Sequence, residues 1–176
     1  MEKDRVLQQR DWSEQEFLEN GFRYFERRKY VFLARELPPE EAPLKMYYEN
    51  DTHIATAGYM ICFSAGWRKR KNLYDYPHWP VAPDHFADMY REWDDPNWKP
   101  NRGEKHLMSL GCKPYYNAVG VWAKKLRQSQ LIQSPEHESP FEVPAGTWLL
   151  LGAKGSTKGV SYWNTDKGFK RRFIIK

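Results

Sequence analysis

Cysteine is scarce in this sequence, which has only Cys62 and Cys112 among 176 residues. Neither cysteine belongs to a Cys-x-x-Cys pair, and two thiols make no disulfide framework, so zinc fingers and secreted disulfide scaffolds are excluded. Long apolar runs are also missing: no stretch approaches the roughly 18 residues that a membrane-spanning helix needs. The opening residues lack the apolar core of a signal peptide. We therefore expect a soluble, cytoplasmic protein with no membrane partner.

Aromatic side chains, in contrast, are abundant. Tryptophan, tyrosine and phenylalanine make up 16% of the chain, roughly twice the share in an average soluble protein. Disordered segments are poor in aromatic residues, so the composition predicts a folded chain. The length suits one ordinary domain or two very small ones.

Charge is unevenly distributed along the chain. The net charge is +5, from 28 basic and 23 acidic residues, yet residues 154–176 alone hold seven basic residues against the single acid Asp166. A second basic run, 68–71, follows Trp67, whereas residues 75–98 are mainly acidic. We therefore expect a bipolar molecule.

Aromatic residues accompany both basic runs. Because cations neutralise phosphates while flat rings stack on bases, such a surface is typical of proteins that bind nucleotides or nucleic acids. The same runs also fit an ordinary solvated face. The aromatic, proline-rich segment 72–80 is either a recognition loop or a plug over the core. The candidate ligand-binding residues are Trp67, Arg68, Arg70, Tyr76, Trp79, Lys154, Lys158, Trp163, Lys170, Arg171 and Arg172.

Helix and strand signals divide the chain into segments. The capping box of Ser13 and Glu16, with Trp12 and Phe17 placed for a hydrophobic staple, predicts a helix over residues 13–28. Residues 30–34 and 59–63 are typical of strands, and a short amphipathic helix is expected near residue 84. The segment 95–114 is rich in Pro, Gly and Asn without a sustained period, which predicts a connector.

The same features recur in the same order on both sides of that connector. FLAREL at 32–37 matches VWAKKL at 121–126, AGYMICF at 57–63 matches AGTWLLL at 145–151, and 84–90 matches 166–173. Three matches in one order predict an internal duplication.

The expected fold is therefore of the α+β class. It has an N-terminal helix within residues 1–28, followed by two related small β-rich units, 29–94 and 115–176, in a pseudo-twofold arrangement. Residues 95–114 connect them. Neither unit is large enough to build a good core alone.

A strand followed by Pro-x-Gly-x-aromatic-apolar, a glycine-marked turn and Phe-x-x-x-aromatic resembles the small bacterial and phage domains called PGDYG proteins. The second unit carries this pattern as Pro144-Ala145-Gly146-Thr147-Trp148-Leu149 with Phe169 and Phe173, and the first as Thr56-Ala57-Gly58-Tyr59-Met60 with Phe86 and Tyr90. Residue 147 is Thr where the family name implies Asp. The resemblance implies a β-rich unit and a phage or mobile-element origin, and it implies no particular reaction or ligand.

No catalytic signature stands out. The glycine-rich segment 152–159 lacks the GxxxxGK[ST] spacing of a phosphate loop, so a hairpin tip that can bind an anion is expected. His53-Ile54-Ala55-Thr56 and His137-Glu138-Ser139 invite comparison with two-histidine phosphoesterases, although only the second has the right spacing. Exposed polar histidines in loops are the favoured alternative. The five histidines show no metal-ligand spacing, and we expect no metal and no cofactor.

Three carboxylates, Asp84, Asp88 and Glu92, are spaced to fall on one helix. This row fits either a solvent face or a set of carboxylates for a divalent cation or for acid–base chemistry.

Two hypotheses on function remain. The first is a non-enzymatic binding protein, phage-encoded and acting on a host factor, that holds a nucleotide, a nucleic acid or a host protein on its basic aromatic face. The second is a small phosphodiesterase or nucleotide-modifying enzyme that uses His53 or His137. The acidic stretch and the basic tail also allow a homo-oligomer.

Overall fold

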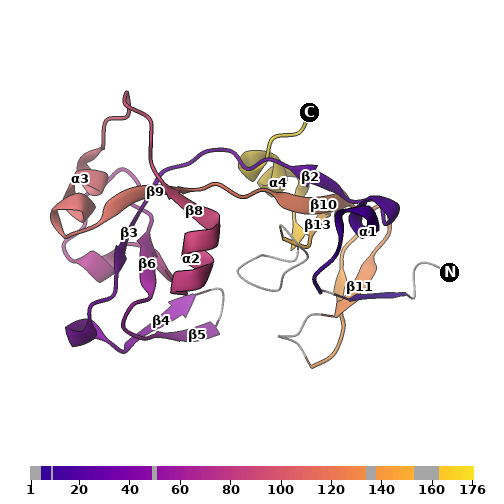
Figure 1. The fold of residues 1–176 in the computed structure, drawn as a ribbon, viewed down its shortest axis with the longest axis horizontal. Coiled ribbons are helices and arrows are strands. Elements are labelled where there is room, and N and C mark those ends of the chain that lie inside the picture. Colours follow the sequence, from indigo (N-terminus) through magenta and orange to yellow (C-terminus); the bar gives the residue numbers. More distant parts are fainter. Residues whose placement is uncertain (1–4, 9, 49–50, 134–137, 153–162) are drawn as a thin grey trace. The chain divides into compact units, whose positions relative to one another are not determined.

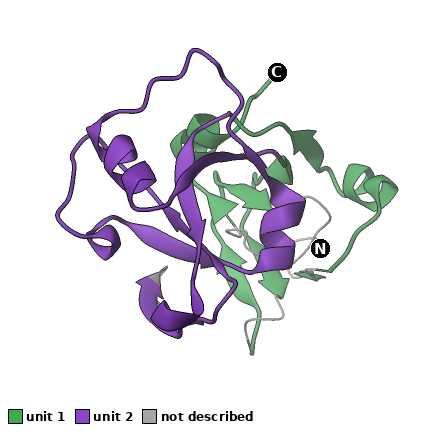
Figure 2. Ribbon diagram, turned by 60° about the vertical axis from the view of Figure 1, so that its left-hand side comes forward, with its two compact units in different colours: residues 1–28, 119–176 green, residues 29–118 purple. Residues whose placement is uncertain are grey.

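The computed structural model describes residues 5–8, 10–48, 51–133, 138–152 and 163–176. Over these residues the chain is a mixed α+β fold, mostly β-sheet, with four short helices (Figure 1). It forms two compact units: unit 1 combines residues 1–28 with 119–176, and unit 2 consists of residues 29–118 (Figure 2). Each unit is described by itself below.

Unit 2 is built on a five-stranded antiparallel sheet with the order β7-β6-β3-β9-β8. A separate two-stranded antiparallel hairpin and two α-helices accompany it. In chain order the elements are β3 (Phe32–Glu36), β4 (Leu44–Tyr48), β5 (Asp51–Ala55), β6 (Met60–Phe63), β7 (His78–Val81), α2 (Pro83–Met89), β8 (Tyr90–Glu92), α3 (Arg102–Ser109) and β9 (Lys113–Asn117). Two short 3-10 turns, Pro39–Glu41 and Leu73–Asp75, complete the unit.

Alternating side chains on the strands of unit 2 form its core. Leu33, Ile61 and Phe63 pack with Leu107, the residue that α3 buries completely. On the other side, Ala34 and Cys62 are covered by partly buried aromatic residues. The five-stranded sheet is therefore apolar on both faces.

Unit 1 contains a four-stranded antiparallel sheet, β14-β13-β10-β2, and a three-stranded sheet, β1-β11-β12. Strand β1 pairs with β11 in parallel, and β11 pairs with β12 in the antiparallel direction. The elements are β1 (Val6–Gln8), α1 (Glu14–Glu19), β2 (Arg23–Phe25), β10 (Val121–Lys125), β11 (Gln130–Gln133), β12 (Phe141–Val143), β13 (Trp148–Leu150), β14 (Trp163–Asn164) and α4 (Asp166–Arg172).

Aromatic stacking builds the core of unit 1. The rings of Phe17 and Trp122 stack with centroids 4.6 Å apart, and those of Trp148 and Phe169 stack at 4.1 Å. The first pair joins α1 to β10, and the second joins β13 to α4. These aromatic residues therefore pack in the core of unit 1.

The predicted N-terminal helix begins as expected and ends early. The capping box of Ser13 and Glu16 is present, and the rings of Trp12 and Phe17 stack at 5.4 Å. The helix ends at Glu19, however, and the prediction that it reaches residue 28 is wrong. Gly21 adopts a φ of +83°, and the Phe22 N–H bonds the Phe17 carbonyl, a Schellman end that turns the chain into β2.

The segment 95–114 is not a plain connector. Residues 102–109 form α3, which begins with a capping box of Asn101 and Glu104. Strand β9 then lies between β3 and β8 in the sheet of unit 2. The compact units also differ from the expected boundaries, because residues 95–114 lie within unit 2 and residues 1–28 complete unit 1.

The segments matched in the sequence make matching hydrogen bonds. The Leu37 N–H donates to the Tyr59 carbonyl at 2.7 Å, and the Leu37 carbonyl accepts from the Gly58 N–H at 3.0 Å. In the same way, the Leu126 N–H donates to the Thr147 carbonyl at 2.9 Å, and the Leu126 carbonyl accepts from the Gly146 N–H at 2.8 Å. Strand register agrees as well, since Ala34 faces Cys62 and Ala123 faces Leu150. Helices α2 and α4 each have seven residues. In both cases a single residue separates the helix from the strand before it, and that strand lies at the edge of its sheet.

The α1–β2 and α3–β9 segments also correspond. Both helices end with the same pair of backbone hydrogen bonds. At the end of α1, the Gly21 N–H donates to the Leu18 carbonyl and the Phe22 N–H to the Phe17 carbonyl. At the end of α3, the Gly111 N–H donates to the Met108 carbonyl and the Cys112 N–H to the Leu107 carbonyl. Strand β2 pairs antiparallel with β10, and β9 pairs antiparallel with β3. In unit 2 this helix-strand segment follows the strand with which it pairs, whereas in unit 1 it precedes that strand.

Candidate anion-binding site

The predicted ligand-binding residues fall in different units. Trp67, Arg68, Arg70, Tyr76 and Trp79 belong to unit 2, and Trp163, Lys170, Arg171 and Arg172 belong to unit 1. Lys154 and Lys158, in the glycine-rich segment 152–159, lie outside the described residues, as does His137.

Segment 72–80 contains a buried tyrosine and runs into strand β7. The Tyr76 side chain is only 1% exposed, so it cannot present its ring to a ligand at the surface. Its hydroxyl accepts a hydrogen bond from the Arg70 N–H at 2.9 Å and lies 2.7 Å from His106 Nδ1. Trp79 is half-buried on β7, with its ring 5.9 Å from that of Phe32. Tyr76 is therefore corrected from a ligand contact to a core residue.

Helix α4 gathers the basic residues predicted in unit 1. Thr165 caps it by accepting from the Gly168 N–H, and its last turn contains Lys170, Arg171 and Arg172. Arg28 donates from its side chain to the Lys170 carbonyl at 3.0 Å. Cations at this end are favoured by the partial negative charge of the helix C-terminus. The expected basic tail is thus a helix end with an arginine from the N-terminal segment beside it.

Asp166 links α4 to β10 and β13. It accepts hydrogen bonds from Lys170 Nζ at 2.8 Å and Trp148 Nε1 at 2.9 Å, and it forms an ion pair with Lys125 Nζ at 3.3 Å. The Lys170 bond, followed by that of Trp148, holds the pKa of the Asp166 carboxyl far below its usual range. One carboxylate thus holds two lysines, Lys125 and Lys170, on the same side of unit 1.

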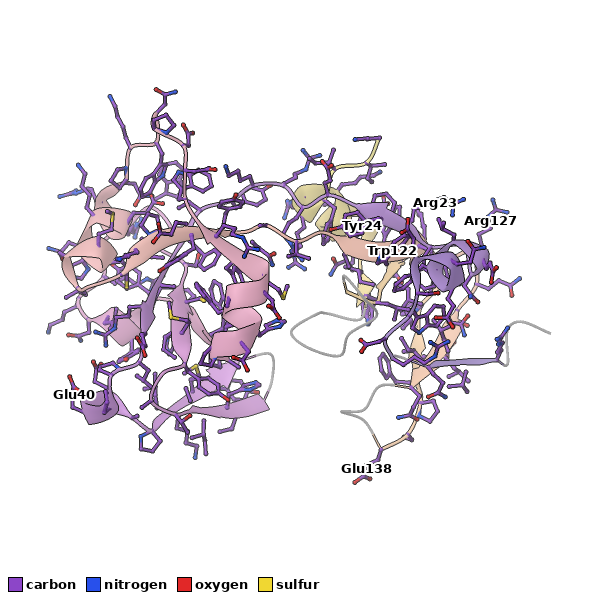
Figure 3. All side chains as sticks on the ribbon, in the orientation of Figure 1. Arg23, Tyr24, Glu40, Trp122, Arg127 and Glu138 are labelled. Carbon is purple, nitrogen blue, oxygen red and sulfur yellow. The ribbon has the colours of Figure 1, made fainter. Side chains whose placement is uncertain are left out.

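A groove next to Lys125 is the feature that the sequence did not reveal. Its volume is about 570 Å³, and four of its side chains are cationic. This size lies within the range of about 300–1,000 Å³ that is typical of ligand sites. The lining residues are Arg5, Leu7, Glu19, Asn20, Gly21, Lys124, Lys125, Arg127 and Gln130. Arg127 is labelled on unit 1 in Figure 3.

The end of α1 and the loop after β10 position the groove. Lys124 donates to the Asn20 carbonyl at 3.1 Å and lies 4.9 Å above the Phe22 ring. Gln130 donates to the carbonyl of Arg5, the residue that precedes β1, and β1 pairs with β11. The residues that meet here are separated by more than 100 positions in the chain, so no local motif announces the site.

The matching place in unit 2 is electrically neutralised. Strand register puts Arg35 where unit 1 has Lys124. Arg35 is bonded to the Glu41 carboxylate and to the Tyr74 hydroxyl, and its side chain is only 18% exposed. The same fold position is thus an internal ion pair in one unit and the wall of a basic groove in the other.

The charge balance of the two units shows the same contrast. Unit 1 contains 16 lysines and arginines against 11 aspartates and glutamates, and unit 2 contains 12 of each. The whole net charge of +5 therefore belongs to unit 1.

The described histidines lie on four elements of unit 2: His53 on β5, His78 on β7, His85 on α2 and His106 on α3. Within the described ranges, no group of three or more His, Cys, Asp or Glu residues is placed to hold a metal ion.

The row of carboxylates expected on one helix is divided. Helix α2 ends at Met89, so Asp84 and Asp88 lie on the helix whereas Glu92 lies on β8. The prediction of three carboxylates along one helix is therefore wrong.

Both thiols are buried. Burial raises the pKa of Cys112 to about 11 and raises that of Cys62 as well, so neither is a ready nucleophile. Among the helices of the described residues, none is long and apolar enough to cross a membrane.

No family model matches the chain, and neither a curated protein nor a solved structure does so. The resemblance to PGDYG proteins therefore rests on the quoted residues alone.

Proposed function

We propose that this chain is a binding protein whose unit 1 holds a phosphate-bearing ligand, a nucleotide or a nucleic acid, on its basic side. The observation that carries this proposal is the concentration of the entire net charge in unit 1, where Lys124, Lys125 and Arg127 wall a groove with Arg5. Lysine and arginine bind phosphates by neutralising their charge and by charge-assisted hydrogen bonds.

The binding surface extends from the groove to α4. Lys125 lines the groove and pairs with Asp166, which also holds Lys170 of α4. Trp163 lies on β14, which is separated from β10 by β13. Its side chain is 40% exposed, so part of its ring is available to stack on a base. Stacking and charge neutralisation together are the usual means of holding a nucleic acid without reading its sequence.

We also propose that the two units are diverged copies of one fold that have exchanged their helix-strand segments. Read along the chain, each copy runs helix, strand, strand, hairpin, two strands and helix: α1 to α2, then α3 to α4. The strand β2 of the first copy pairs in unit 1, and β9 of the second copy pairs in unit 2. The matching Schellman ends and the matching bonds of Leu37 and Leu126 support a common origin.

The enzymatic alternative is a phosphodiesterase that uses His53 or His137. The binding proposal needs no catalytic histidine. A host protein as the partner remains the other class of ligand. If the chain binds a host protein but no nucleic acid, that class of ligand is favoured.

The test is a binding titration with two matched charge reversals. Arg5→Glu with Arg127→Glu alters two exposed cations of the groove, and Lys45→Glu with Lys113→Glu alters two exposed cations of unit 2. For a fluorescein-labelled oligonucleotide, the salt dependence of log K should lose about one unit of slope for each phosphate contact removed. The groove variant should lose this slope and much of its affinity, and the unit 2 variant should keep both. Equal effects of the two variants, or no affinity in the unaltered protein, would contradict the proposal.

A further inference from the structure

We propose that the loop 66–71 of unit 2 is a built contact for single-stranded nucleic acid, in which Trp67 stacks on an unpaired base and the following cations meet phosphates. This inference rests on the proposed function and names its ligand class. It concerns a surface of unit 2 that is separate from the groove of unit 1.

Trp67 has no structural role among the described residues. Its side chain is 87% exposed, the highest value among the large hydrophobic side chains described. Leaving an indole ring in water forgoes the stabilisation that burial of so large an apolar surface would give. Only an unpaired base offers its full face to such a ring, because the bases of a duplex are already stacked on one another.

The cations that follow Trp67 are free to act on a ligand. Arg68, Lys69, Arg70 and Lys71 are all exposed. Within the described part of the chain, no carboxylate forms an ion pair with any of them. Four adjacent cations without internal partners raise the local affinity for a phosphate backbone.

The loop is held at both ends, so the contact is preorganised. At its start, Asn101 Nδ2 donates to the Gly66 carbonyl at 2.8 Å. Towards its end, the Arg70 N–H donates to the hydroxyl of buried Tyr76, which lies 2.7 Å from His106 Nδ1. A fixed loop loses less conformational entropy on binding than a free one.

Helix α3 also approaches the loop backbone closely. A Cβ atom at Gly103 would lie 3.0 Å from the Ala65 carbonyl oxygen and 3.1 Å from that of Arg68. Both neighbours are backbone atoms, so the glycine allows the loop to lie against the first turn of α3. Gly103, Asn101 and Tyr76 are therefore positioning residues for the loop.

The experiment compares affinities for an oligothymidylate of about 15 nucleotides and for a duplex of the same length, the size of a typical single-strand site. Trp67→Ala should weaken single-strand binding by about tenfold or more, in line with the loss of one stacked base, and should leave duplex binding unchanged. Trp67→Phe should restore most of the affinity. Because Trp67 is exposed, neither change should alter the melting temperature.

A second variant tests the positioning of the loop. Tyr76→Phe removes the acceptor of the Arg70 N–H while keeping the buried ring, so single-strand affinity should fall whereas duplex affinity stays. If Trp67→Ala binds the single strand as well as the unaltered protein does, this inference is overturned and the groove proposal stands. If a polyglutamate peptide binds the loop as tightly and with the same dependence on Trp67, the ligand is an acidic protein and the inference is also overturned. If the unaltered protein binds no nucleic acid, the proposed function itself fails.

Discussion

Individual residues decide which parts of the surface are free to bind. Asp166 gathers Lys125, Lys170 and the Trp148 indole around one carboxylate, whereas Lys124 is held by a carbonyl at the end of α1. In unit 2 the residue that matches Lys124 is Arg35, which forms an ion pair with Glu41. The two matching positions thus differ in the partner that the structure gives them: Arg35 is paired with a carboxylate, and Lys124 donates to a backbone carbonyl.

Glu16 provides a pH-dependent test of the first helix. Its carboxylate accepts from Arg10 and from the Ser13 N–H, and these bonds lower its pKa to about 2. A pKa depressed in the folded state gives stability that is present above the ordinary value and lost as the pH falls towards the folded value. We therefore expect Glu16→Gln, which keeps the capping geometry, to lower the urea midpoint at pH 7.

The same substitution should have progressively less effect from about pH 4.5 down to about pH 2. Glu14→Gln, in the same first turn and without such bonds, serves as the control. A Glu16→Gln effect that is the same at pH 7 and near pH 2 would show that the charge is not what stabilises this turn.

At the scale of elements, the sequence predicts the start of α1 but neither its end nor helix α3. The Ser13 and Glu16 pattern located the start of α1, because a capping box involves only neighbouring residues. The end of α1 was missed, because Gly21 and Phe22 form a Schellman turn that depends on Phe22 packing beside Phe17 and Trp12. Helix α3 was missed although Asn101 and Glu104 formed the same readable pattern, because the surrounding Pro, Gly and Asn residues indicated a connector.

The candidate site shows the same limit. The basic end of α4 was visible in the sequence as a run of like charges. The groove was not, because Arg5, Lys124 and Arg127 come together only through the pairing of β1 with β11 and the docking of α1 on β10. Tyr76 was misplaced for a related reason, since an aromatic residue in a proline-rich segment gives no sign of whether its ring points inwards.

The proposed exchange of helix-strand segments can be tested by nuclear magnetic resonance. Tyr24 should show nuclear Overhauser contacts to Trp122, and Pro114 should show them to Leu33, because these are facing residues of β2 with β10 and of β9 with β3. Without the exchange, each strand would pair within its own copy, and Tyr24 would instead contact Leu33. Observation of that second pattern would contradict the proposed exchange.

At the scale of the whole molecule, two similar units carry different charge. Unit 2 is neutral and contributes an anchored loop with one exposed tryptophan, and unit 1 carries the entire excess of positive charge. If the two units are diverged copies, as we propose, substitutions that added basic residues to one copy alone are enough to give this difference. We propose that a phosphate-bearing ligand binds to this charged unit.

The most direct measurement is a titration of the isotope-labelled full chain with an oligonucleotide, followed by amide chemical shifts. We expect the largest shifts at residues 124–130, around Arg5 and along α4, with a second group at 66–71, and all should weaken as salt rises from about 50 to 200 mM. Shifts confined to other parts of unit 2, or the absence of any salt-dependent shift, would contradict the account.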